Sequence, residues 1–395
     1  MLALSLPNSK SNGNGAHRKV RAEIVGWGMC APRRVMTNDE LAAMLDTSDE
    51  WIRGRTGIAR RHIVSDGETT ASMAIAAAQD ALQVADADPR EIDLVIVATS
   101  TPDHVFPSTA CQVQDALAAR HAGAFDLNAA CSGFVYALAM GHQAIASGEH
   151  QQVLVIGADA LSSRLDWTDR GTCILFGDGA GAVLLRATDA DAGVMATVLG
   201  ADGSGGELLK IPAGGCAVPT THESVTQGLH YLRMDGRLVY RFASGVLAEA
   251  AEQVAHKAGW EVSAIDRLIP HQANVRIIES AAKRLGLPME RFVVNLEEYG
   301  NTSAASVPIA LCEAIEAGTI RPGDQLVMVG FGAGLTWAAA AVKWRRSPEE
   351  VYVSRQRRWW RWSLYQWAHL RSGVRRGLGR LAIWFIRTVE GRDDR

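Results

Sequence analysis

Three short apolar segments decide the fold: EIDLVIVAT (residues 91–99), VLVIGAD (153–159) and QLVMVGF (325–331). Segments of this length, rich in valine and isoleucine, predict buried β-strands. Alanine-rich stretches of helical length lie around them, at 71–85, 108–120, 132–147, 245–258, 275–286 and 303–317. The alternation of strands and helices over residues 20–343 predicts an α/β fold.

The strands belong to an internal repeat with a spacing of 173 residues. Ile92-Asp93 precedes one strand and Ile265-Asp266 precedes another, and Gly157 corresponds to Gly330. The turn at 128–132 falls opposite the turn at 301–303. We therefore expect two copies of one α/β unit, over residues 20–195 and 196–343, packed face to face. A functional site between the copies would take residues from each.

The composition is typical of a soluble globular protein. Apolar residues make up 48% of the 395 residues and charged residues 21%, and the mean hydropathy is 0.00. These values argue against disordered, collagen-like and transmembrane classes. Six cysteines are scattered without a CxxC motif or a Cys/His pair at metal-ligand spacing, so we expect reduced thiols, a cytoplasmic location and no metal site. Residues 1–19 form a polar leader that we expect to be flexible.

The C-terminal segment has a different character. From Trp344 to Arg395 there are thirteen arginines against five acidic residues, a net charge of +8, which leaves −11 on residues 1–343. Five tryptophans alternate with arginine within 355–388, which suits an amphipathic helix on an anionic membrane. A cover over the protein's own surface, a partner-binding helix and a disordered extension are the alternatives. The acidic body argues against nucleic-acid binding.

Cys131 lies where a predicted strand (124–128) meets a predicted helix, in FDLNAACSGFVYALAMG (125–141). The positive end of the helix dipole favours the thiolate, which is the nucleophilic form. Small neighbours leave room for a thioester substrate: Ala129, Ala130, Ser132 and Gly133. The alternative is a buried structural thiol.

The second half supplies two further polar groups at strand ends. His271 lies in PHQANVRII (270–278) after a predicted strand (264–269), and Asn301 lies in YGNTSAAS. Loops after strands carry the functional groups of α/β folds. Taken alone, His271 is as well explained as a hydrogen-bonded loop histidine. Together, Cys, His and Asn suit acyl chemistry on thioesters, because the thiolate is acylated and neutral donors stabilise an enolate oxygen. Such chemistry requires no metal or redox cofactor.

Longer strings extend this pattern over residues 20–344. The chain resembles β-ketoacyl-[acyl-carrier-protein] synthase III of type II fatty-acid synthesis, and the resemblance lies in EWIRGRTGIARRH, DLNAACSGF, DRGTCILFGDGAGAVLL, PHQANVRII, GNTSAASVPIAL and GFGAGLTW. It implies a thiolase-like fold, in which two duplicated halves form a five-layered αβαβα architecture. The repeat agrees with that architecture. The basic extension (344–395), which we expect to be helical, departs from the family.

The resemblance also implies the reaction. Cys131 accepts an acyl group from acyl-CoA, and His271 and Asn301 assist decarboxylation of malonyl-acyl carrier protein and hold the enolate, giving 3-oxoacyl-acyl carrier protein, CO₂ and CoA. Backbone N–H groups of Cys131 and of a glycine-rich turn would bind the acyl oxygen; the turn is Gly332, Ala333 and Gly334. Ala333 stands where some relatives have glycine and fits if its φ is negative. The alternative is a turn kept small only for packing.

Substrate contacts are implied in the same way. The residues matched to CoA and pantetheine binding are Trp51, Arg55, Thr56, Arg170, Gly236 and Asn274. Trp51 and Arg170 would hold the adenine, although Trp51 alone is as well explained as a core residue. Phe176 would line the acyl pocket, and Phe106 would enter the acyl pocket of the partner in a homodimer.

A basic patch would meet the acidic carrier protein. The residues matched to that contact are Arg241, Gln272, Ala273, Asn274, Val275, Arg276, Lys283 and Arg284. A local basic patch on an acidic body would steer an acidic partner. For Lys283 and Arg284 a solvated helix face is the alternative.

The sequence thus predicts a homodimeric cytoplasmic condensing enzyme that initiates fatty-acid synthesis. A synthase III-like acyltransferase of secondary metabolism, with an oxygen, nitrogen or other carbon nucleophile, is one alternative. A membrane-recruited scaffold with a vestigial site is the other. The length and branching of the starter acyl group depend on pocket side chains and stay open.

Overall fold

The computed structural model describes residues 20–347 and thirteen residues of the C-terminal extension, namely 360, 361, 363–368, 370, 371, 373, 374 and 378. The leader over residues 1–19 and the rest of the extension lie outside the described residues. All six cysteines are described, and all are free thiols.

Two sheets form the framework. The first sheet has the order β1-β7-β6-β4-β5, with bounds β1 Arg21–Cys30, β7 Asp178–Thr188, β6 Gln152–Ala160, β4 Leu94–Ala98 and β5 Gly123–Leu127. The second has the order β11-β12-β13-β8, with bounds β11 Arg267–Pro270, β12 Gln325–Gly332, β13 Thr336–Lys343 and β8 Gly193–Ala201. Strands buried on both faces are mostly apolar, as in β6, whose nine residues are all buried and, except for Gln152 and Asp159, all apolar.

The structure agrees with the internal repeat. β4 and β11 begin 173 residues apart, and so do β6 and β12. α5 (Gly133–Ala146) and α10 (Ser306–Glu316) begin at the same spacing. The boundary between the halves differs slightly from the expected 195/196, because β8 begins at Gly193 and pairs with β13 of the second sheet.

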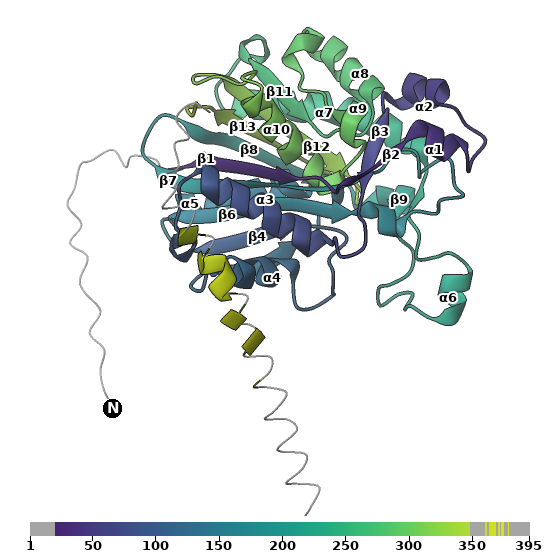
Figure 1. The fold of residues 1–395 in the computed structure, drawn as a ribbon. Helices are drawn as coiled ribbons and strands as arrows, with labels where there is room; N and C mark the ends of the chain where they lie inside the picture. The colour runs from purple at the N-terminus through teal and green to yellow at the C-terminus, as the bar shows by residue number, and fades with distance from the viewer. Residues whose placement is uncertain are drawn as a thin grey trace, which may run out of the picture.

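Helices and sheets form five layers (Figure 1). α5 and α10 share one apolar core with both sheets and so form the central layer. α3 (Thr70–Val84) and α4 (Thr109–Ala116) cover the outer face of the first sheet. α7 (Gly236–Lys257) and α8 (Val275–Leu285) cover the outer face of the second. The predicted α/β class and αβαβα layering are therefore confirmed.

Smaller elements form a cap beside the second sheet, seen on the right in Figure 1. They are β2 (Arg34–Thr37), α1 (Asn38–Ala42), α2 (Asp49–Thr56), β3 (Arg60–Ile63), β9 (Leu209–Lys210), α6 (His222–Thr226), β10 (Arg233–Met234) and α9 (Leu296–Tyr299). Fully buried Arg61 ties this cap to the first half, because its guanidinium donates to Asn38 Oδ1 and to the carbonyl of Ile174, both at 2.8 Å.

Short 3₁₀ turns complete the chain: η1 (Pro89–Glu91), η2 (Ala130–Ser132), η3 (Leu161–Arg164), η4 (Gly203–Leu208), η5 (Val262–Ala264), η6 (Met289–Arg291) and η7 (Ser303–Ala305). η2 and η7 are equivalent in the repeat and both precede central helices. Each contains a non-glycine residue with positive φ, Ala130 at 47° and Ser303 at 51°.

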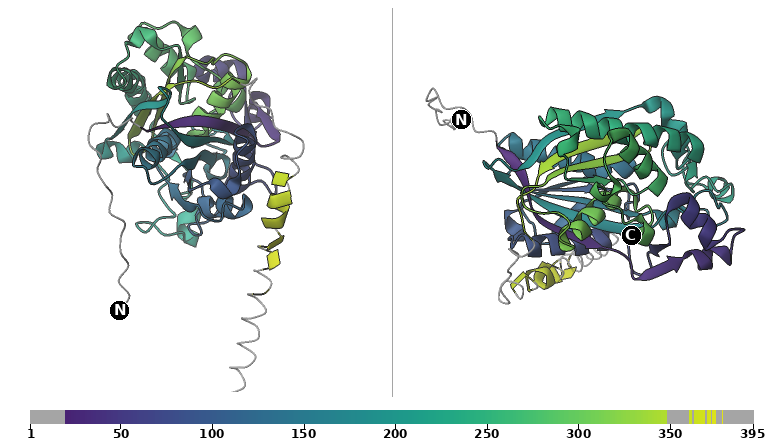
Figure 2. Two further views of the ribbon diagram at one scale, coloured as in Figure 1. Left: turned by 90° about the vertical axis from the view of Figure 1, so that its left-hand side faces the viewer. Right: turned by 90° about the horizontal axis from the view of Figure 1, so that it is seen from above.

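From residue 360 on, the described residues of the C-terminal extension are helical, whereas residues 344–347 are not. Arg361 is 4% exposed, and its guanidinium pairs with Asp86 at 2.9 Å. Arg371 pairs with Asp115 at the end of α4, at 3.0 Å. The helix therefore runs beside the outer layer of the first half, where the two views of Figure 2 show its described part in yellow. The predicted span of 355–388 is described only in these residues.

Candidate active site

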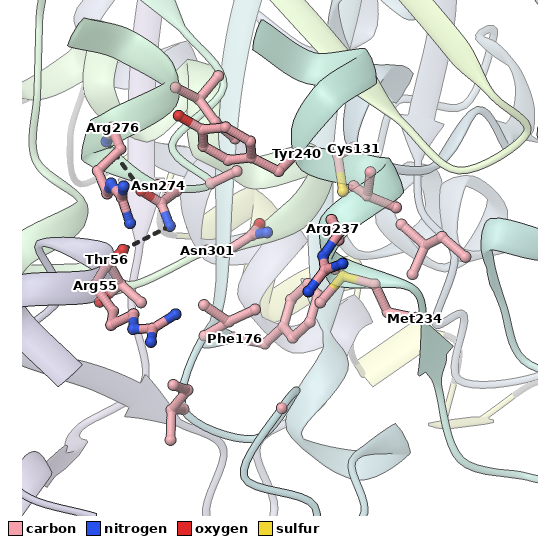
Figure 3. A pocket seen from close by; sticks show the side chains of 18 of the residues that line it. Arg55, Thr56, Cys131, Phe176, Met234, Arg237, Tyr240, Asn274, Arg276 and Asn301 are labelled. Atoms are coloured by element: carbon pink, nitrogen blue, oxygen red, sulfur yellow. Dashed lines mark hydrogen bonds between the residues drawn. The ribbon is translucent and has the colours of Figure 1, made fainter. Parts of the chain in front are cut away.

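Residues of both halves line one cavity of about 590 Å³ (Figure 3). Its lining includes Cys131 from the first half and His271 and Asn301 from the second. A second cavity of about 420 Å³ also contains Cys131, and Phe176 borders both. Cys131 thus lies where two chambers meet, so one chamber can hold the carrier part of a thioester and the other its acyl group.

Cys131 lies in η2, between the end of β5 and the start of α5, and is 6% exposed. Burial raises the pKa of its thiol to about 12. The expectation that the helix terminus favours a resting thiolate is therefore wrong, because loss of hydration disfavours the charged form more strongly. Ser303 Oγ donates a hydrogen bond to Cys131 Sγ at 3.4 Å.

His271 follows β11 and is 2% exposed. Its Nδ1 lies 2.6 Å from Ser306 Oγ, and its ring meets Phe331 edge to face, with centroids 5.0 Å apart. Burial lowers the pKa of His271 to about 3, so the ring is neutral at physiological pH. When the Ser306 hydroxyl donates to Nδ1, the ring proton lies on Nε2, which can then donate to a substrate oxygen.

Asn301 is 6% exposed and is held on its backbone and its side chain. Its N–H donates to the carbonyl of Leu175 at 2.8 Å, and its Oδ1 accepts from the N–H of Ser303 at 2.9 Å. Because the oxygen is occupied, the Nδ2 donors are available to the cavity, where Figure 3 shows the side chain. Asn301 and His271 can therefore both donate to one oxygen anion.

The glycine-rich turn lies against the nucleophile. A Cβ at Gly332 would come within 2.8 Å of the Cys131 nitrogen, so only glycine allows β12 to approach this closely. Gly334 has φ +133°. Ala333 has no positive φ, which meets the condition for alanine at this position, and it borders the second cavity.

The residues matched to CoA and pantetheine binding all line the 590 Å³ cavity: Trp51, Arg55, Thr56, Arg170, Gly236 and Asn274. The guanidinium carbons of Arg55 and Arg170 lie 5.2 and 4.8 Å from the centroid of the Trp51 ring. Asn274 Nδ2 donates to the carbonyl of Arg55 at 3.0 Å and ties α8 to α2. The structure therefore brings this set together at one end of the cavity.

Two implied contacts lie elsewhere. Gln272 is 1% exposed, and its amide donates to the carbonyls of Pro270 and Val293. The expectation that Gln272 contacts the carrier protein is therefore wrong, because its side chain is buried against the neighbouring loops. Phe106 is 85% exposed and does not line either cavity of its own chain.

The other basic positions lie on two helices in contact, α7 and α8. Ala273 and Arg276 line the cavity, and Val275 is half-buried against the core of the second half. The four cationic side chains that the resemblance matched are all exposed: Arg241, Arg276, Lys283 and Arg284. Arg284 is partly neutralised, because it pairs with Glu249 at 2.7 Å.

Several residues of the site were not predicted from the sequence. Arg237 and Tyr240 of α7 line the cavity beside Cys131 and Asn301 (Figure 3). Ser303 and Ser306 contact the thiol and the imidazole. The signal for the serines was their spacing of two and five residues from Asn301, but small polar residues near glycine are common in turns. Among the described residues, no group of three His, Cys, Asp or Glu side chains could hold a metal ion.

Comparisons with known proteins agree with this geometry. Residues 125–203 match the family model "3-Oxoacyl-[acyl-carrier-protein (ACP)] synthase III", and residues 255–344 match its C-terminal counterpart. A β-ketoacyl-[acyl-carrier-protein] synthase III of Symbiobacterium thermophilum is 52% identical over 82% of this chain and 98% of its own length.

Solved structures give the same result. The 3-oxoacyl-[acyl-carrier-protein] synthase III of Aquifex aeolicus superimposes with a TM-score of 0.76 at 46% identity, over 82% of this chain and 100% of that one. The priming β-ketosynthase of the R1128 polyketide pathway superimposes with a TM-score of 0.77 at 38% identity, over 83% of this chain and 97% of that one. The chain therefore belongs to the 3-oxoacyl-[acyl-carrier-protein] synthase III family of condensing enzymes.

Proposed function

We propose that Cys131, His271 and Asn301 divide two half-reactions of the condensing enzyme that initiates fatty-acid synthesis. In the first, Cys131 Sγ bonds to the acyl carbon of acyl-CoA, the bond to the CoA sulfur breaks, and the thiol proton leaves with CoA. Ping-pong transfer of this kind needs a nucleophile between an acyl chamber and a carrier chamber. The position of Cys131 at the junction of the two cavities is the observation that carries the proposal.

In the second half-reaction, malonyl-acyl carrier protein loses CO₂ and its enolate attacks the acyl-enzyme. Negative charge develops on the thioester oxygen of the malonyl group. Neutral donors from His271 and Asn301 stabilise that oxygen, and the buried site strengthens both hydrogen bonds. The carbon–carbon bond then forms as the bond from the acyl carbon to Cys131 Sγ breaks, which regenerates the thiol and gives 3-oxoacyl-acyl carrier protein.

The division of roles is tested by measuring the half-reactions separately. His271→Ala is expected to take up label from acyl-CoA at Cys131, yet to release little CO₂ from malonyl-acyl carrier protein. Cys131→Ala is the opposite control, because it cannot be acylated. Equal loss of both half-reactions in His271→Ala would overturn the division. Adducts measured by intact-protein mass spectrometry over acetyl to octanoyl and branched acyl-CoAs would also identify the starter.

The substrates themselves supply all the carbon and the driving force, so the proposed reaction uses neither a metal nor a redox cofactor. CoA binding is assigned to the cavity end with Trp51, Arg55 and Arg170. An adenine between Trp51 and Arg170 would replace the contact that these two side chains make with each other. The guanidinium would then stack on the base instead of on the indole.

Acyl carrier protein is the second proposed partner. Support comes from the exposed cations of α7 and α8 beside the cavity, on a body whose overall charge is negative. Lys283→Glu is expected to raise the KM for malonyl-acyl carrier protein and to leave the KM for acyl-CoA unchanged. If both constants move together, the effect is not on carrier-protein docking.

A homodimer is proposed from two exposed features of the first half. β5 is an edge strand of its sheet, and Phe125 on it is 42% exposed. The neighbouring loop exposes Val105 and Phe106. Unpaired edges and exposed apolar loops are typical of surfaces that pair with another chain. Light scattering of Phe106→Ser tests this, and an unchanged dimer would show that Phe106 contributes little to the interface.

The location is proposed to be the cytoplasm, with peripheral membrane contact through the C-terminal extension. In the described part of the chain no helix has the length and apolar content needed to cross a bilayer. Four apolar residues at helical spacing are more than half exposed: Trp367, Leu370, Val374 and Leu378. Apolar residues in an arginine-rich helix suit an anionic lipid surface.

Vesicle co-sedimentation tests the membrane contact. The full chain is expected to bind vesicles containing phosphatidylglycerol more strongly than phosphatidylcholine vesicles, and deletion of 345–395 should abolish the difference. Equal sedimentation with and without the extension would overturn the contact. A scaffold with a vestigial site is disfavoured, because all three catalytic side chains line one cavity. A role in secondary metabolism is disfavoured because the chain is 52% identical to a β-ketoacyl-[acyl-carrier-protein] synthase III but only 38% identical to the priming β-ketosynthase of a polyketide pathway.

A further inference from the structure

A buried carboxylate joins the two halves behind the active site. Asp159 ends β6 of the first half and is fully buried. Its Oδ1 accepts hydrogen bonds from Ser100 N at 2.8 Å, from Thr101 N at 3.1 Å, and from the hydroxyls of Thr99 and Thr101 at 3.1 and 2.9 Å. Its Oδ2 accepts from Ala304 N at 3.2 Å, in η7 of the second half.

Asp159 thereby holds η7 next to the nucleophile. Ser303, the first residue of η7, has φ +51°, which is unfavourable for any residue other than glycine. The strained conformation is maintained by hydrogen bonds on both sides, because Ser303 N donates to Asn301 Oδ1 and Ala304 N donates to Asp159. The result is that the Ser303 hydroxyl reaches Cys131 Sγ. Within the described residues it is the one side chain that hydrogen-bonds this sulfur.

The same segment reaches the histidine three residues later. Ser306 begins α10 and lies one helical turn from Ser303, and its Oγ is 2.6 Å from His271 Nδ1. Both serines are 2% exposed; Ser303 borders the second cavity, and its hydroxyl also interacts with the Asp159 carboxylate. One short segment therefore touches both groups to which the two half-reactions were assigned.

We propose that residues 303–306 form a two-armed positioning segment, in which Ser303 serves Cys131 during acyl transfer, Ser306 serves His271 during decarboxylation, and Asp159 holds the segment in place. This inference rests on the proposed division of roles between Cys131 and His271. It adds three positioning residues to the three catalytic ones.

The contribution of Ser303 follows from the change of charge on sulfur. A neutral thiol is a weak hydrogen-bond acceptor, whereas a thiolate accepts strongly. As the proton leaves and Sγ bonds to the acyl carbon, the Ser303 hydroxyl stabilises the negative charge that passes through the sulfur. Because the bond is stronger in the transition state than in the resting enzyme, it accelerates the step. The high pKa of the resting thiol is consistent with a site that needs such a donor.

The contribution of Ser306 follows from the tautomer of the ring. A hydroxyl that donates to Nδ1 keeps the proton on Nε2, where it can reach the enolate oxygen. Loss of that bond allows the other tautomer, in which Nε2 carries no proton and repels the oxygen anion. Ser306 therefore acts on the second half-reaction and not on the first.

The test compares Ser303→Ala and Ser306→Ala in both half-reactions. Ser303→Ala is expected to slow acylation of Cys131 by roughly 10- to 100-fold, the range for a lost hydrogen bond to a charged group, and to leave CO₂ release within about threefold. Ser306→Ala is expected to do the reverse. Ser306→Thr keeps a hydroxyl and should recover most of the CO₂ release, which loss of packing alone would not.

Ser162→Ala is the matched control, because Ser162 is a buried serine bonded to another buried carboxylate, Asp178, at 2.5 Å. It should lower stability without separating the half-reactions. Asp159→Asn keeps an oxygen that accepts from Thr101 but replaces the oxygen that accepts from Ala304. The segment that carries both serines then loses its anchor, so kcat should fall in both half-reactions while the KM for acyl-CoA stays unchanged.

The outcomes separate this inference from the proposal on which it rests. If His271→Ala separates the half-reactions but the two serine variants slow both equally, the positioning segment is wrong and the division of roles stands. If His271→Ala does not separate them, the division itself is wrong. If Ser303→Ala acylates at the wild-type rate, Ser303 has no positioning role.

Discussion

Gly332→Ala is the substitution whose effect the structure defines most closely. A Cβ at this position would lie 2.8 Å from the Cys131 nitrogen and 3.0 Å from its Cβ, whereas ordinary contact begins at 3.4 Å. The nucleophile turn would have to move by about 0.5 Å or β12 would have to yield, and β12 is buried between its neighbours. Misplacement of a reacting group by about 1 Å costs on the order of 100-fold in rate, so about half that shift is expected to slow acylation by roughly 10-fold or more.

Stability should fall as well, but the enzyme should stay folded. Overpacking of one methyl group costs about 1–3 kcal/mol, which is less than the free energy of unfolding of a typical domain. The assay is the rate of Cys131 acylation by acyl-CoA, followed by mass spectrometry, together with thermal unfolding of the same samples. Gly203→Ala is the control, because a Cβ there meets nothing within 4 Å. Wild-type acylation by Gly332→Ala would refute the claim that close approach of β12 positions the nucleophile.

Three further predictions concern other groups of the site. Burial lowers the pKa of His271 to about 3 in the folded state, so on acidification the unfolded state takes up the proton first, near pH 6.5. The free energy of unfolding should therefore fall between about pH 6.5 and about pH 3. In urea titrations, His271→Gln should make this fall shallower. Burial raises the pKa of Cys131 to about 12, so the rate of its alkylation by iodoacetamide should still be rising with pH at pH 10. Peptide mass spectra in which this rate reaches a plateau near pH 8 would contradict the burial argument. Trp51→Ala should raise the KM for acyl-CoA roughly 3- to 30-fold and leave kcat unchanged. Steady-state kinetics that show a lower kcat instead would contradict a role of Trp51 in substrate binding alone.

The protein's composition and periodicity were sufficient to predict the fold class. Buried strands carry a recognisable run of apolar residues, and β4, β6 and β12 lie within a few residues of their predicted bounds. The repeat was visible because a duplicated unit keeps its spacing. The expected boundary at 195/196 falls just inside β8, which begins at Gly193 after the turn at 189–192 and pairs with β13 of the second sheet.

The positions of Cys131 and His271 were also predictable, because each follows a strand within a distinctive string; Asn301 lies in a distinctive string too, but it follows α9 and not a strand. Tertiary structure decided their chemistry. Burial is a property of the packed molecule, and it reversed the expected thiolate preference of Cys131. It also removed Gln272 from the surface, although its neighbours Ala273 and Asn274 line the cavity.

The sequence by itself determined the αβαβα fold, the repeat and the identity of the three side chains proposed for catalysis, because each of these is visible in local patterns or in recognisable strings. Only the tertiary structure decided which serines contact the thiol and the imidazole, and that Asp159 of one half holds a turn of the other. The contacts of Ser303 with Cys131 and of Ala304 with Asp159 join residues more than a hundred positions apart, and Ser306 and His271 are 35 positions apart. Their geometry depends on how two sheets pack around the central helices, which no local pattern specifies.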